Sequence, residues 1–136
     1  MRWRISMKYA EFRARLKALC FGESAYKENI DELKTITQMA LEDVATRVVP
    51  ARLVSSDMRR YPMLRAIDSL RFVRRPMTIV SDDSEIDLDD SLITALLYRT
   101  ATQIVGENKR QLYETLYRKE LDNYVFARFY SMQEEA

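Results

Sequence analysis

The most constraining feature of this sequence is a helical pattern over residues 89–106 that leaves almost no polar face. Its apolar residues recur at helical spacing: Leu92, Ile93, Leu96, Leu97, Ala101, Ile104 and Val105. A helix that is apolar on nearly all sides must be surrounded by other elements. We therefore expect residues 89–106 to form a central, largely buried helix that Gly106 closes.

Two helices are predicted before this segment. Residues 6–20 carry one apolar face at helical spacing, and Gly22 follows as a stop signal. That face consists of Tyr9, Phe12, Leu16, Leu19 and Cys20. Residues 24–48 form a second, long pattern that Ser24 can cap and Pro50 ends. Its inward stripe consists of Ile30, Leu33, Thr37, Leu41, Val44 and Val48, broadened by Ile36, Met39 and Ala40.

A fourth, long helix is predicted over residues 108–132. One face carries Tyr113, Tyr117, Leu121, Tyr124 and Arg128, widened by Leu112, Leu116, Val125 and Phe129. Tyrosine suits a surface that is apolar in its body and wet at its tip. Two interpretations stay open: core packing of a half-exposed helix, or a docking face for another protein. The candidate docking residues are Trp3, Tyr113, Tyr117 and Tyr124.

The chain is predicted to be mainly α, a single domain over residues 1–136. With 136 residues, two Gly and three Pro, it favours a bundle of about four helices, two of them long, over a many-turned β-sandwich. A small β element of two or three short strands is expected between the second and third helices, within an irregular insert over residues 49–80. Candidate strands are 51–55, 70–74 and 77–80. Residues 1–5 are interpreted as a basic arm and 131–136 as a tail.

Charge is segregated along the chain, although the net charge is only +1. Residues 47–76 carry eight Arg and two Asp, whereas residues 77–90 carry six acidic and no basic residues. Such blocks can be a solvated surface or the two faces of a self-associating unit. For the second interpretation, the candidate contacts between copies are Arg71, Arg74, Arg75, Asp82, Asp83, Glu85 and Asp87.

The arginine-rich block also suits phosphate groups, because guanidinium groups bind phosphate in a fork geometry. The candidates to face DNA or another partner are Arg47, Arg52, Arg59, Arg60 and Arg65. No recognition helix with base-reading residues stands out, which disfavours sequence-specific reading.

The acidic turn over residues 81–90 is the one cluster that could attract a cation. An EF-hand loop started at Asp83 would have Leu88 at its sixth place and Thr94 at its twelfth, where Gly and Glu are needed. Helix capping by Asp89 and a solvated loop explain the turn better, with Leu88 and Ile93 as a hydrophobic staple. No metal site and no cofactor are predicted.

No catalytic residue is predicted either. The chain has no His, so it lacks His-dependent acid–base and triad chemistry, and two glycines cannot build a phosphate loop. Its one cysteine, Cys20, lies on an apolar helical face and is expected to be an inert core residue. Because a single cysteine cannot form a disulfide within the chain, a reducing compartment is expected. No apolar run approaches the roughly 20 residues of a membrane span, and no partner membrane is predicted.

One longer pattern resembles a known family. The order RFVRRPMTIV, an acidic loop, EIDLDDSLITALLYRTATQIVG and LYETLYRKELDNYVFARF, over about residues 70–130, resembles the head–tail connector, or adaptor, proteins of tailed bacteriophages. In that family a similar segment opens a central helix, and a long Tyr-bearing helix follows. The basic first helix and the long second helix depart from the pattern.

The resemblance implies a structural virion protein that is not an enzyme, assembled in the host bacterial cytoplasm. Its copies, commonly twelve, would form a ring beneath the portal protein, extend the channel for packaged double-stranded DNA, and dock tail or stopper proteins. The alternative is a small helical DNA-binding or regulatory protein that uses the Arg-rich segment 47–75.

Overall fold

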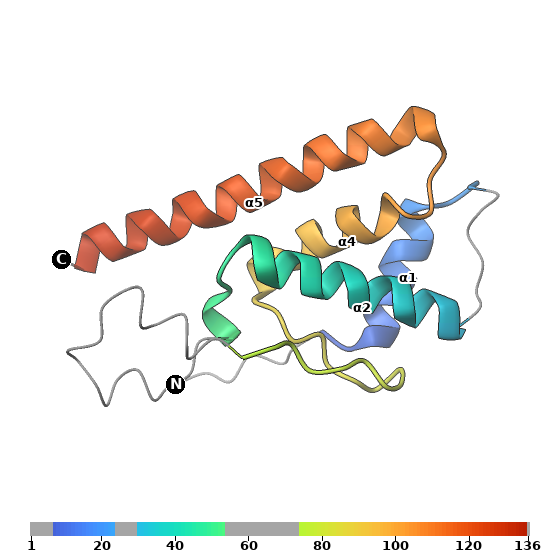
Figure 1. Cartoon of the computed structure of the whole chain (residues 1–136), viewed down its shortest axis with the longest axis horizontal. Coiled ribbons are helices and arrows are strands. Elements are labelled where there is room, and N and C mark those ends of the chain that lie inside the picture. The colour runs from blue at the N-terminus through green and yellow to red at the C-terminus, as the bar shows by residue number, and fades with distance from the viewer. Residues whose placement is uncertain (1–6, 24–29, 54–73, 136) are drawn as a thin grey trace.

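The structure is a computed structural model, and it describes residues 7–23, 30–53 and 74–135. Within these residues the chain forms four α-helices: α1 (Tyr9–Leu19), α2 (Ile30–Arg47), α4 (Ile93–Ala101) and α5 (Glu107–Glu135). Two short 3₁₀ turns lie between α2 and α4: η1 (Ala51–Leu53) follows α2, and η4 (Asp90–Leu92) leads directly into α4 (Figure 1). The prediction of a mainly helical fold is confirmed.

Helix α4 is central, as its all-round apolar pattern predicts. It packs against α1, α2 and α5, and Ile93, Ala95 and Leu96 are buried (Figure 1). It is shorter than the predicted range 89–106: the α-helix ends at Ala101, and turns follow over residues 102–104. Gly106 does not close it: the Gly106 carbonyl accepts hydrogen bonds from the backbone N–H groups of Lys109 and Arg110, and so begins α5.

The predicted faces of the first two helices form much of the core. Tyr9, Phe12, Leu16 and Cys20 are buried, and so are Leu33, Thr37, Leu41, Val44 and Val48. Some residues expected to widen the apolar faces are instead exposed, namely Met39 on α2 and Leu112 and Val125 on α5. The helical spacing therefore identified the buried stripes but overestimated their width.

The acidic loop caps the start of α1. The first N–H groups of a helix have no partner inside the helix, and the Lys8 side chain makes no cap. The carbonyl groups of Ser84 and Asp82 accept hydrogen bonds from Tyr9 (2.8 Å) and Ala10 (3.1 Å) instead. This contact fixes the loop against a helix more than 70 positions earlier in the sequence.

The predicted β element is not supported. Ala51–Leu53 is a 3₁₀ turn, and residues 77–80 belong to no strand. Side chains bind the backbone there: Asp87 accepts from the Met77 N–H group and Gln38 from the Ile79 N–H group, both at 2.9 Å. In the described ranges the one β-type pairing is an isolated bridge between Lys8 and Glu85. Most of the candidate strand 70–74 lies outside the described residues.

Helix α5 is longer than predicted and absorbs most of the expected tail, since it continues to Glu135. Its 29 residues correspond to roughly 43 Å at 1.5 Å per residue. It runs along one side of the molecule, over α4 (Figure 1). None of the helices in the described ranges is both long and apolar enough to cross a membrane. The predicted arm over residues 1–5 lies outside the described residues.

Candidate functional site: a buried aspartate between two arginines

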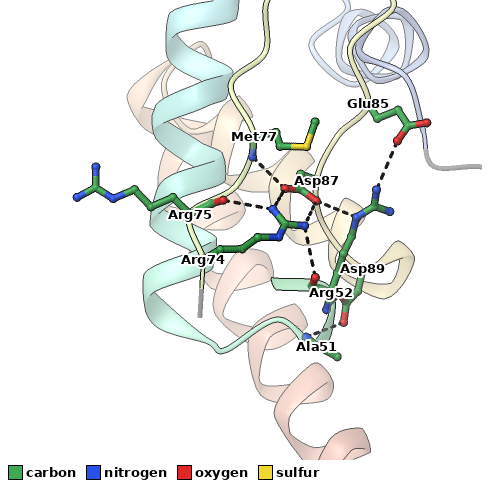
Figure 2. A network of polar contacts seen from close by, with 8 residues as sticks. All are labelled: Ala51, Arg52, Arg74, Arg75, Met77, Glu85, Asp87 and Asp89. Carbon is green, nitrogen blue, oxygen red and sulfur yellow. Dashed lines mark hydrogen bonds and ion pairs between the residues drawn. The ribbon is translucent and has the colours of Figure 1, made fainter. Parts of the chain in front are cut away.

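Asp87 is the centre of the most connected polar cluster in the described part of the chain. It lies between Ile86 and Leu88, both buried, where the acidic loop turns towards η4. Figure 2 shows the side chains of Arg52, from η1, and Arg74 converging on its carboxylate. The sequence placed these charges in separate blocks, and the fold brings them together within one chain.

Both carboxylate oxygens of Asp87 are fully used. Oδ1 accepts from Arg52 Nε (2.8 Å) and Arg74 Nη2 (2.9 Å). Oδ2 accepts from the Met77 N–H group (2.9 Å) and from Arg74 Nη1. The Asp87 side chain is only 2% exposed, so these four bonds replace its lost hydration.

The cluster keeps Asp87 ionised. Burial alone would raise its pKa, but the hydrogen bonds from Arg74, the Met77 N–H group and Arg52 outweigh burial and lower the pKa to about 2. Hydrogen bonding to Asp87 correspondingly raises the pKa of Arg74. A carboxylate in this state neither donates a proton near neutral pH nor offers a free lone pair, so the cluster acts as a clamp.

The clamp joins the ends of two described segments, 30–53 and 74–135, which meet at Leu53 and Arg74. The Leu53 carbonyl accepts a hydrogen bond from the Arg74 N–H group (3.0 Å), and the Arg52 carbonyl accepts from Arg74 Nη2 (3.5 Å). Asp87 therefore connects η1, residues 74–77 and the acidic loop (Figure 2).

Asp89 makes a second connection to η1. It stands at the N-cap position of η4, but its side chain makes no cap bond there. Its carboxylate accepts from the N–H groups of Ala51 (3.2 Å) and Arg52 (2.8 Å) and from the Tyr124 hydroxyl (2.6 Å). The predicted cap is thus corrected: Asp89 satisfies the first N–H groups of η1 and ties η1 to α5.

The other acidic residues of the loop also pair within the chain. Asp82 bonds Arg13 (3.0 Å), and Glu85 lies 3.5 Å from Arg52. Asp83 approaches Lys8 at 3.9 Å while remaining 92% exposed. The acidic block is therefore largely neutralised by basic residues of its own chain.

These pairings revise the predicted contacts between copies. Arg74 and Asp87 pair inside one chain, and Asp87 is buried, so Asp87 is not placed to contact a neighbouring subunit. The exposed side chain of Arg75 extends away from the cluster (Figure 2). With Glu42 and Pro76, Arg75 lines a separate pocket. Arg71 lies outside the described residues.

The candidate DNA-facing arginines have different surroundings. Arg52 is held in the Asp87 cluster. Arg47, the last residue of α2, bonds Asp43 Oδ2 (3.1 Å) and lies over the Tyr117 ring, with half of its side chain exposed. Arg59, Arg60 and Arg65 lie outside the described residues.

Two of the candidate docking tyrosines belong to the core. Tyr117 and Tyr124 are buried, and their hydroxyl groups donate to Asp43 (2.9 Å) and Asp89. Burial, followed by the hydrogen bond to Asp89, raises the pKa of Tyr124 to about 12. Burial, followed by the hydrogen bond to Asp43, likewise raises the pKa of Tyr117. Tyr113 is partly buried, its ring 5.8 Å from that of Tyr98. Trp3 lies outside the described residues.

Two further features concern metal ligands and the thiol group. Residues 7–23, 30–53 and 74–135 contain no group of three His, Cys, Asp or Glu side chains placed to hold a metal ion. Burial raises the pKa of the Cys20 thiol to about 11, which keeps it protonated and unreactive.

Comparison with known proteins adds no family. No protein-family model, no curated protein and no solved structure matches this chain. Its function must be inferred from its residues, their geometry and the resemblance described above.

Proposed function

We propose that the chain is a head–tail connector subunit of a tailed bacteriophage. Its copies form a ring beneath the portal, link the head to the tail and extend the DNA channel. The observation that carries the proposal is the pattern over residues 70–130, in which an acidic loop opens a central apolar helix and a long Tyr-bearing helix follows.

The arrangement of the helices supports this proposal. The segment that the resemblance implies to be the central helix is α4, which packs on all three other helices of the described part. The final helix, α5, is the longest of the described elements and runs along the outside of the molecule (Figure 1). A long outer helix provides a surface that a neighbouring copy can cover.

Exposed apolar residues supply two different faces for head-to-tail contacts. One is on α5, where Leu112 and Phe126, 14 residues apart, share one side of the helix and are each more than half exposed. The other is on residues 74–80, where Met77 and Val80 are similarly exposed. These two segments lie on opposite sides of the helical body (Figure 1). A ring needs unlike faces of this kind, and burying apolar side chains favours their association.

The test is to mix the purified chain with portal rings from the phage or prophage whose genome encodes it, and to image the mixture by negative stain. Added density at one end of the portal ring, with the symmetry of the assembly, is the expected result. The chain alone is a control, and a monomer there is compatible with assembly only on the portal.

Three variants test which surfaces form the ring. Phe126→Glu on α5 and Val80→Glu on the opposite segment should each abolish the added density, because a charge would be buried in the contact. Phe21→Glu is the matched control, since Phe21 is 86% exposed and belongs to neither face. Absence of portal binding, together with a monomer that retards duplex DNA at low salt, would overturn the proposal in favour of the DNA-binding alternative.

A further inference from the structure

A second arginine cluster lies where α2, α4 and α5 meet. Arg47 ends α2, Arg99 lies in the last turn of α4, and Arg118 lies on α5. These three side chains line a pocket of about 160 Å³ together with Gln103, Glu114 and Tyr117. Arginines from three separate helices thus line one small cavity.

Asp43 orients two of these arginines by their Nε atoms. Its Oδ2 atom accepts from Arg47 Nε (3.1 Å) and Arg99 Nε (3.0 Å), as well as from the Tyr117 hydroxyl. Arg99 Nη1 also donates to Thr102 Oγ1 (3.0 Å). Because the bonds to Asp43 use the Nε atoms, both terminal nitrogens of Arg47 and one of Arg99 keep donors for another acceptor.

The third arginine is not neutralised. In the described part of the chain, Arg118 makes no hydrogen bond and no ion pair, and Glu114, one turn earlier on α5, does not pair with it. Three guanidinium charges therefore face two carboxylates, Asp43 and Glu114, which leaves the pocket with net positive charge. The volume corresponds to about five water molecules at about 30 Å³ each, which is room for a small tetrahedral oxyanion together with some of its water.

We propose that this pocket binds a phosphate-type oxyanion, with Arg47, Arg99 and Arg118 donating to it and Asp43 positioning the first two. Guanidinium groups prefer phosphate oxygens because several N–H donors match them in a planar fork. The phosphate can be a phosphodiester of DNA or free inorganic phosphate. This inference does not depend on ring assembly, so it can fail or succeed independently of the connector function.

Arg118 separates this role from a purely structural one. Arg47 and Arg99 stabilise Asp43 whether or not an anion binds, so their loss alone would be ambiguous. Arg118 has no such contact and is exposed, and Arg118→Gln should leave the thermal unfolding temperature unchanged. Lys119→Gln is the matched control, because it removes one positive charge from the next, exposed position of α5.

The experiment titrates the full chain with inorganic phosphate, followed by NMR shifts of the arginine side chains, and with a short duplex DNA, followed by fluorescence anisotropy. Arg118→Gln should weaken binding about three- to tenfold relative to Lys119→Gln. Arg47→Gln should weaken it similarly.

The two ligands distinguish the source of the phosphate. A loss specific to Arg118→Gln for DNA, with free phosphate competing, assigns the pocket to backbone phosphate. A loss for inorganic phosphate alone assigns it to the free anion. The proposal is overturned if the wild-type chain binds neither ligand, or if Arg118→Gln and Lys119→Gln bind both equally.

Discussion

The Asp87 and Asp43 clusters contain nearly the same parts in different states. Each places one aspartate between two arginines from different elements. Asp87 uses both oxygens for four bonds and is 2% exposed, whereas Asp43 uses Oδ2 for three bonds and is 25% exposed. Four N–H donors bind Asp87. Arg47 and Arg99 bind Asp43 only through their Nε atoms, so they keep terminal N–H donors for a ligand.

The difference teaches that residue types alone do not separate a structural ion cluster from a binding site. What separates them is whether the aspartate accepts hydrogen bonds from most of the arginine N–H donors or leaves several of these donors without an acceptor. A buried, fully bonded cluster adds rigidity, and removing one partner leaves charge unpaired in the interior. A half-open cluster stabilises less and retains donors for a ligand. The following predictions test this contrast, from the largest expected effect to the smallest.

Asp87→Asn should destabilise the protein by about 3 kcal/mol, because it removes the charge that compensates Arg52 and Arg74 in a buried setting. Urea unfolding followed by circular dichroism measures this change. Asp83→Asn, in the same loop but almost fully exposed, should stay within about 0.5 kcal/mol of the wild type. Equal effects of the two substitutions would contradict the clamp.

Stability should fall at acidic pH through Asp87. Its folded pKa of about 2 lies below the unfolded value of about 3.9, so its contribution is fully present above pH 3.9 and is lost as pH falls towards 2. The loss should be about 2 kcal/mol. Urea unfolding midpoints between pH 5 and 2 measure it, and Asp87→Asn should show a correspondingly flatter dependence.

Asp43→Asn should cost only about 1 kcal/mol, because the carboxylate is partly hydrated and the amide oxygen can still accept a hydrogen bond. The same urea titration gives the value. A loss as large as that of Asp87→Asn would show that the two clusters do not differ as their exposure indicates.

Arg118→Gln should change the free energy of unfolding by less than about 0.5 kcal/mol. Chemical unfolding at low and high salt checks this, and neither condition should separate it from Lys119→Gln. A destabilisation above 1 kcal/mol would reveal a structural contact for Arg118.

Helical spacing predicted the buried stripe of α1 and the central place of α4, because these depend on local periodicity. It could not rank the tyrosines of α5, since Tyr113, Tyr117 and Tyr124 share one face and their burial depends on the helices opposite. The β prediction over residues 77–80 was wrong because extended apolar residues also occur where side chains, here Asp87 and Gln38, bind the backbone.

The sequence also could not single out Asp87 among six acidic residues. One signal was present: Asp87 alone stands between two large aliphatic residues, Ile86 and Leu88, and both are buried. Its arginine partners are 13 and 35 positions away, and only the fold brings them close. The Asp43 pocket was missed for the same reason, because Arg47, Arg99 and Arg118 come from three distant helices.

The hydrogen bond between the Leu53 carbonyl and the Arg74 N–H group holds together two positions that are 21 residues apart in the sequence. The entropic cost of closing a loop grows only logarithmically with its length, by about 0.6 kcal/mol for each doubling. The Asp87 clamp, which binds both Arg52 and Arg74, helps to offset this cost. Closure at this point therefore depends on the bonds of the clamp more than on the number of residues between Leu53 and Arg74.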